Sequence, residues 1–84
     1  MKYCLITFRS VTPAQRAESM LRRAGLECSV QRTPRWMEEQ GCGYSLRVRF
    51  QDAMHCAQLL RSGGVSFRKI YLYRDKGAVE ELAL

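Results

Sequence analysis

The sequence predicts an α+β fold, with a four-stranded antiparallel sheet and two helices on one of its faces. Three observations lead to it. A helix-start pattern lies at Thr12, glycines that can end helices lie at Gly25 and Gly63, and apolar residues alternate with polar ones between Tyr44 and Gln51. These signals give the element order β-α-β-β-α-β, for which right-handed crossovers favour a ferredoxin-like arrangement.

The chain opens with a predicted strand and a predicted helix. Residues 2–8 are rich in β-branched, aromatic and other apolar side chains, which is typical of a strand. A helix is predicted over residues 13–24. Thr12 fits its N-cap, Pro13 fits the first helical position, and Gln15 completes a capping box.

Two further strands are predicted on either side of a loop. Residues 26–32 form the first of them, and the Thr33-Pro34 step ends it. Residues 44–50 show the clearest pattern of a half-buried strand, because every second side chain is apolar. These apolar residues are Tyr44, Leu46, Val48 and Phe50.

A second helix and a last strand complete the predicted fold. Asp52 can cap a helix over residues 52–62. A strand is predicted over residues 66–73, and its pattern leaves two registers open. Either the face of Phe67 and Tyr71 or the face of Ile70 and Leu72 is buried.

The length allows one small domain. A chain of 84 residues buries only about 60% of the surface that it exposes when unfolded, so its core is thin. We expect residues 1–74 to form this domain. Residues 75–84 form an acidic and apolar tail, predicted to be a short helix or a frayed end.

The charge of the chain favours anionic partners. Its formal net charge is +6 and its pI is about 9.6, which suits nucleic acid, small oxyanions or an acidic protein face. The arginines are spread along the chain rather than collected in one run. Charge alone therefore does not choose among these partners.

The four cysteines are not spaced as metal ligands. The chain has no Cys-x-x-Cys pair and one histidine, whereas structural zinc sites use closely spaced ligand pairs. No signal peptide or apolar run of about 20 residues is present in the sequence. We therefore expect a cytoplasmic protein with free thiols, no metal, no cofactor and no membrane span. Cys4, Cys28 and Cys56 fall on predicted strands or a helix and are expected to fill the core.

Cys42 differs from the other cysteines because it lies in a loop between two glycines. Gly41 and Gly43 allow a shaped backbone and a close approach, and Pro34 also favours a loop. Arg35 lies seven residues before the thiol and can stabilise a thiolate. Chemistry at Cys42 is the sharpest hypothesis that the residues support.

The predicted topology gives Cys42 a second set of neighbours. The first two strands run parallel in this topology, so the Cys42 loop lies at the same end of the sheet as Arg9 and Ser10. The first helix also begins there, and a helix N-terminus carries partial positive charge. This field would lower the pKa of the Cys42 thiol.

The sequence resembles a family of small bacterial proteins described as selenium or sulfur carriers. The resemblance spans residues 3–73, and its specific part is a Pro-Arg step followed later by Cys-Gly at a strand start. The matching residues are Tyr3, Leu5, Ile6, Thr7, Phe8, Ser10, Ala14, Leu21, Gly25, Pro34, Arg35, Cys42 and Gly43. The resemblance implies that Cys42 holds a persulfide or selenopersulfide, which passes between donor and acceptor proteins.

Two positions depart from the family pattern. Trp36 stands where the family tends to have an acidic residue, and Gly41 replaces a small hydroxyl residue before the cysteine. The first change alters a contact surface, and the second loosens the loop. Neither removes the thiol.

Two other classes of function stay open beside the carrier. A ferredoxin-like sheet can bind RNA through stacked aromatic residues, and such a face would use Arg47, Arg49, Arg68, Tyr71 and Tyr73. The chain could instead be a protein-binding or homo-oligomeric assembly module. A conventional enzyme is not expected, because the sequence has no carboxylate pair, phosphate-binding glycine loop or usable nucleophile-base pair. His55 and Cys56 are adjacent on a predicted helix, so they point about 100° apart.

Overall fold

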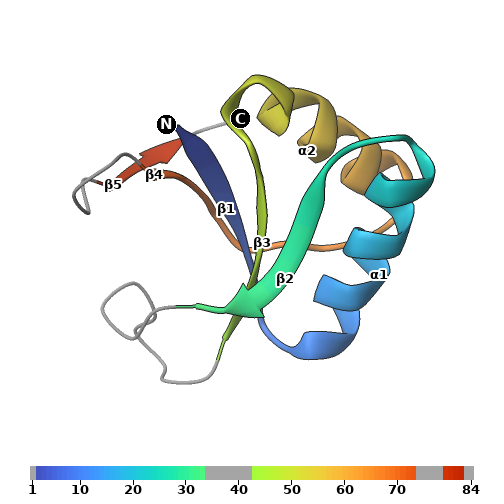
Figure 1. The fold of residues 1–84 in the computed structure, drawn as a ribbon. Coiled ribbons are helices and arrows are strands. Elements are labelled where there is room, and N and C mark those ends of the chain that lie inside the picture. Colours follow the sequence, from blue (N-terminus) through green and yellow to red (C-terminus); the bar gives the residue numbers. More distant parts are fainter. Residues whose placement is uncertain (1, 34–42, 74–78, 83–84) are drawn as a thin grey trace.

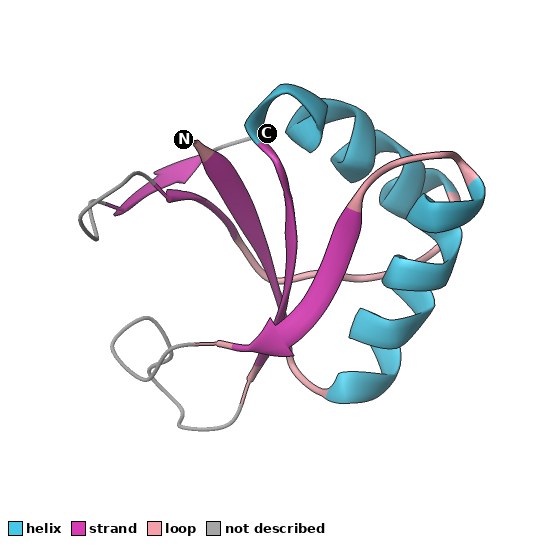
Figure 2. Ribbon diagram, viewed as in Figure 1, coloured by secondary structure: helices cyan, strands magenta, loops and turns pink. Residues whose placement is uncertain are grey.

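The computed structural model describes residues 2–33, 43–73 and 79–82. These residues form one antiparallel sheet with the strand order β2-β3-β1-β4-β5. Both helices cover the same face of the sheet, and the other face is free of helices (Figures 1 and 2). The elements are β1 (Tyr3–Phe8), α1 (Val11–Arg23), β2 (Cys28–Arg32), β3 (Tyr44–Arg49), the short 3-10 turn η2 (Phe50–Asp52), α2 (Ala53–Ser62), β4 (Ile70–Tyr73) and β5 (Val79–Leu82).

The α+β class, the two helices and the antiparallel sheet are confirmed, but the predicted number of strands is wrong. Residues Val79–Leu82 form a fifth strand, β5, in a region predicted to be a short helix or a frayed end. This strand pairs with β4, with Glu81 opposite Tyr71. The Lys69 ammonium lies 3.5 Å from the Glu81 carboxylate, and Leu82 packs against the core. Contacts with β4 therefore stabilise a segment whose glutamates are poor strand formers.

The helix α1 starts earlier than predicted, and the capping box at Thr12 is wrong. Its N-cap is Ser10, in an extended conformation with φ −149° and ψ 174°. Pro13 consequently occupies the third helical position, where its missing N–H costs nothing, because the first-turn N–H groups have no partner within the helix. The buried face of α1 consists of Ala14, Ala17 and Leu21.

Both helices end at the predicted glycines. The N–H of Leu26 donates to the carbonyl of Leu21 at 2.9 Å, and the N–H of Gly25 donates to that of Arg22 at 3.0 Å. This pair of bonds is a Schellman motif, in which the residue after the helix adopts a positive φ. Gly25 has φ 81°, and Gly64, after α2, has φ 75°. Glycine is favoured at both positions because it carries no Cβ.

The strand β4 is shorter than predicted, and of the two faces left open by the sequence it buries that of Ile70 and Leu72. It begins at Ile70, so the prediction of a strand from residue 66 is wrong. Ile70 and Leu72 are buried against the helices, and Tyr71 lies on the other face of the sheet. The segment before β4 is instead held by the end of β1: the N–H of Arg68 donates to the carbonyl of Thr7 at 2.7 Å.

Candidate functional site

The segment that contains Cys42 begins and ends at one end of the sheet. The N–H of Thr33 donates to the carbonyl of Gly43 at 3.0 Å. In the strand register, Arg32 lies opposite Tyr44, and Tyr44 lies opposite Phe8. The two described ends of this segment are therefore held together where β1 ends (Figure 1).

Several predicted site residues lie outside the described part of the chain. These are Pro34, Arg35, Gly41 and Cys42, so their predicted roles stay predictions. Trp36 also lies outside it.

Arg9, Ser10 and Gly43 are described, and all three lie at this end of the sheet. Arg9 and Ser10 are exposed and connect β1 directly to α1. The Ser10 side chain makes no capping hydrogen bond, and the first turn of α1 has no acidic residue. The partial positive charge of this helix end is therefore not offset by a carboxylate of its own first turn.

Further basic residues lie at the same end, and sequence reasoning did not assign them to this site. Arg32 ends β2, and Arg68 and Lys69 precede β4. The Thr7 hydroxyl fixes the latter segment, because it donates to the Lys69 carbonyl at 3.2 Å and accepts from the Lys69 N–H at 3.0 Å. This contact joins residues 62 positions apart. The only signal in the sequence was the polar Thr7 within an apolar strand.

Two buried hydroxyl groups lie at the base of the segment. Ser45 is completely buried and Thr33 is 8% exposed. Within the described residues, neither hydroxyl has a hydrogen-bond partner. Because buried hydroxyl groups normally have a partner, Thr33 and Ser45 are exceptions within the described residues.

The other three cysteines fill the core, as predicted. Cys4 and Cys56 are completely buried, and Cys28 is 9% exposed. Burial raises the pKa of the Cys4 thiol to about 11 and that of Cys56 to about 12. It also raises the pKa of Cys28, although a hydrogen bond with Arg22 acts in the opposite direction. At neutral pH these thiols therefore stay protonated and are poor nucleophiles.

His55 does not assist Cys56. His55 is exposed on α2, whereas Cys56 points into the core. Within the described ranges, no group of three or more His, Cys, Asp or Glu residues could hold a metal ion. No described helix is both long and apolar enough to cross a membrane.

The buried thiols make stability depend on alkaline pH. A thiol with a raised pKa in the folded state contributes stability that is complete below its ordinary pKa of 9.0 and is lost as the pH rises through its folded value. We expect the free energy of unfolding to fall between about pH 9 and pH 11, and to fall less steeply for Cys56→Ala, because Cys56 has the higher folded pKa. Urea unfolding at several pH values measures how steeply the free energy of unfolding falls with pH in the wild type and in Cys56→Ala. Equal slopes would contradict the raised pKa of Cys56, since the two proteins differ only at this residue.

Comparison with known families identifies the class of the protein. A family model described as "Putative Se/S carrier protein-like" matches residues 3–72. The chain belongs to this family. Searches of the curated proteins and of the solved structures found no significant match.

Proposed function

We propose that this protein carries sulfur or selenium on Cys42 and passes it from a donor protein to an acceptor protein. Membership of the carrier-like family over residues 3–72 is the observation that carries this proposal. Cys42 is the cysteine outside the described core, and its peptide bond to Gly43 attaches it to the start of β3. The other three thiols are buried and protonated, which leaves Cys42 as the candidate nucleophile.

The transfer is an exchange between thiolates and sulfane sulfur. The Cys42 thiolate attacks the outer sulfur of a donor persulfide, so a new S–S bond forms while the donor S–S bond breaks. The donor leaves as a thiolate, and Cys42 becomes a persulfide. An acceptor thiolate then attacks the outer sulfur and releases Cys42. With selenium, the outer atom is selenium and the steps are otherwise the same. No net oxidation occurs, so the exchange needs no cofactor.

The basic end of the sheet supports this chemistry. Arg9 and Arg32 are exposed there, and the N-terminus of α1 adds partial positive charge. Positive charge near a thiol favours the thiolate. Arg35 and Pro34 complete this site in the proposal, with Gly41 and Gly43 allowing the donor to approach. The same charges would dock an acidic partner, so transfer is expected to weaken as salt is added.

The proposed role is that of a carrier rather than an enzyme. We infer that β1 to β4 with the two helices form a ferredoxin-like core, supported by the strand order β2-β3-β1-β4, and that β5 extends it. A carrier needs a reactive sulfur and a docking surface, and a domain of this size can supply both. The proposed location is the cytoplasm, where free thiols persist.

Loading by a donor tests the proposal. A cysteine desulfurase with cysteine should add one labile sulfur to the wild type, which intact mass spectrometry detects and dithiothreitol removes. Cys42→Ser should gain none. Cys28→Ala is the matched control, because it removes a core thiol that is not expected to carry cargo. An equal adduct on Cys42→Ser would show that the proposal is wrong.

A further inference from the structure

The face of the sheet away from the helices carries a row of planar side chains. The rings of Tyr3 and Tyr73 stack with their centroids 4.9 Å apart and an angle of 18° between their planes. The guanidinium carbon of Arg47 lies 4.2 Å from the centroid of the Tyr3 ring. The row Arg47–Tyr3–Tyr73 therefore crosses three neighbouring strands, β3, β1 and β4.

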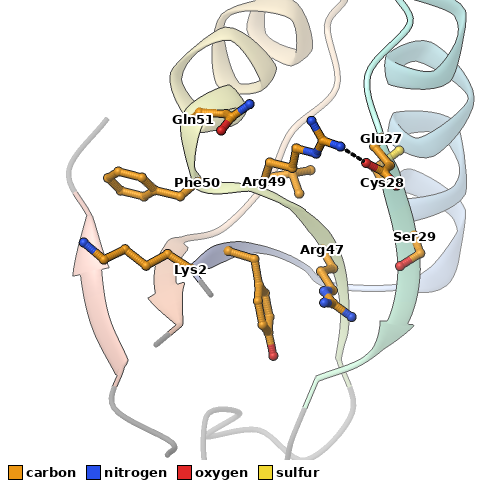
Figure 3. A pocket seen from close by; sticks show the side chains of 10 residues that line it. Lys2, Glu27, Cys28, Ser29, Arg47, Arg49, Phe50 and Gln51 are labelled. Carbon is orange, nitrogen blue, oxygen red and sulfur yellow. Dashed lines mark ion pairs between the residues drawn. The ribbon is translucent and has the colours of Figure 1, made fainter. Parts of the chain in front are cut away.

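A hollow of about 800 Å³ adjoins this row (Figure 3). Tyr3 and Arg47 line it together with Lys2, Arg49 and Phe50. The Phe50 side chain is 44% exposed, so its ring is accessible from solvent. The Lys2 ammonium lies 5.7 Å from the centroid of the Phe50 ring. The hollow thus has a second aromatic surface beside a cation.

The charge around the hollow is positive. Arg49 forms an ion pair with Glu27, with a nitrogen–oxygen distance of 2.7 Å. Lys2 and Arg47 contact aromatic rings, and no carboxylate of the described residues pairs with either of them. Within the described residues, the two cations beside the stacked rings therefore have no carboxylate partner.

We propose that this face binds single-stranded nucleic acid. Bases stack on the Arg47–Tyr3–Tyr73 row and on Phe50, and phosphates lie near the Lys2 and Arg47 cations. Unpaired bases stack on aromatic rings and guanidinium planes, and cations beside them attract the phosphate backbone. An acidic peptide would need the cations but would have no use for a row of planar groups. A duplex would keep its bases covered.

The proposed surface is distinct from the Cys42 end. Tyr3 lies opposite Arg49 at one end of β1 and β3, whereas Phe8 lies opposite Tyr44 at the other. The nucleic-acid proposal therefore does not depend on sulfur or selenium chemistry. Cys42→Ser should bind the oligonucleotide as the wild type does.

Fluorescence polarisation with labelled single-stranded RNA of mixed sequence, about ten nucleotides long, tests the proposal. The wild type should bind, with an affinity that falls as salt is added. Phe50→Ala should weaken binding about tenfold, which corresponds to the loss of one stacked base. Lys2→Gln with Arg47→Gln should weaken it by a similar factor or more. Thermal unfolding of each variant establishes that it is folded.

The matched control removes the same charge from the helical face. Arg16 and Arg23 are exposed on α1, so Arg16→Gln with Arg23→Gln should change binding less than about twofold. An equal loss in this control would show only general attraction to a polyanion and would overturn the proposal. Unchanged binding by folded Phe50→Ala would also overturn it. So would equally tight binding of an acidic peptide or of duplex RNA, since neither presents unpaired bases.

Discussion

Limited alkylation near neutral pH is expected to modify Cys42 at least about a hundred times faster than Cys4 or Cys56. The pKa of Cys4 is raised from 9.0 to about 11 and that of Cys56 to about 12, so their thiolate fractions fall by about a hundredfold or more, and the thiolate is the reacting form. Their complete burial slows the reaction further. Iodoacetamide labelling followed by peptide mapping measures the four rates.

Labelling in urea is the control for this experiment. Once the protein is unfolded, all four cysteines should react at similar rates, because both burial and the raised pKa values are lost. At a pH near 11, labelling of the folded protein should be faster at Cys4 than at Cys56, because a larger fraction of the Cys4 thiol is then thiolate. If Cys4, Cys28 or Cys56 reacts as fast as Cys42 in the folded protein, Cys42 is not the distinctive thiol.

Phe8→Ala is expected to lower the free energy of unfolding by about 3–5 kcal/mol. Phe8 is completely buried at the end of β1 and is among the largest fully buried side chains of the core. A domain of this kind has a total stability of about 5–15 kcal/mol, so the variant should be partly unfolded or unfold in little urea. Denaturant unfolding followed by circular dichroism measures the change.

The matched control is the same substitution at an exposed phenylalanine. Phe50 is 44% exposed, so Phe50→Ala should cost about 1 kcal/mol or less. Similar losses for Phe8→Ala and Phe50→Ala would contradict the burial that the structure assigns to these two residues.

The elements with strong local signals were predictable from the sequence. Gly25 and the Gly63-Gly64 step end the helices where expected, because the positive φ values of Gly25 and Gly64 favour glycine. The alternation from Tyr44 correctly predicted that β3 is a strand. Its last predicted apolar residue, Phe50, instead lies in η2 and is 44% exposed, while Ser45 is buried. The strand β5 was not predictable, since Glu80 and Glu81 have low strand propensity and pairing with β4 is what forms it.

The candidate site was predicted only in part, because contacts between segments far apart in the sequence leave no local pattern. The sequence singled out Cys42 and its glycines and predicted that Arg9 and Ser10 lie at the same end of the sheet. Local patterns could not reveal the contact between Thr7 and Lys69, which are 62 positions apart. They also could not show which hydroxyl groups are buried at this end.

The face of the sheet away from the helices was also predictable only in part. Arg47, Arg49, Arg68, Tyr71 and Tyr73 were predicted as a candidate nucleic-acid face. Strand alternation was enough to group four of them, whereas Arg68 precedes β4 and contacts Thr7 at the end of β1. The stacking of Tyr3 between Arg47 and Tyr73 depends on the order of β3, β1 and β4 in the sheet. Local sequence patterns do not reveal this strand order, so the stacking could not be predicted from them.

Intact mass spectrometry of the protein purified from cells without reductant tests the carrier function most directly. The wild type should show an added sulfur or selenium atom that dithiothreitol removes, and Cys42→Ser purified in parallel should show neither. The same labile adduct on Cys42→Ser, or a wild type that carries none while the desulfurase fails to load it, would contradict the assignment of Cys42 as the carrier residue.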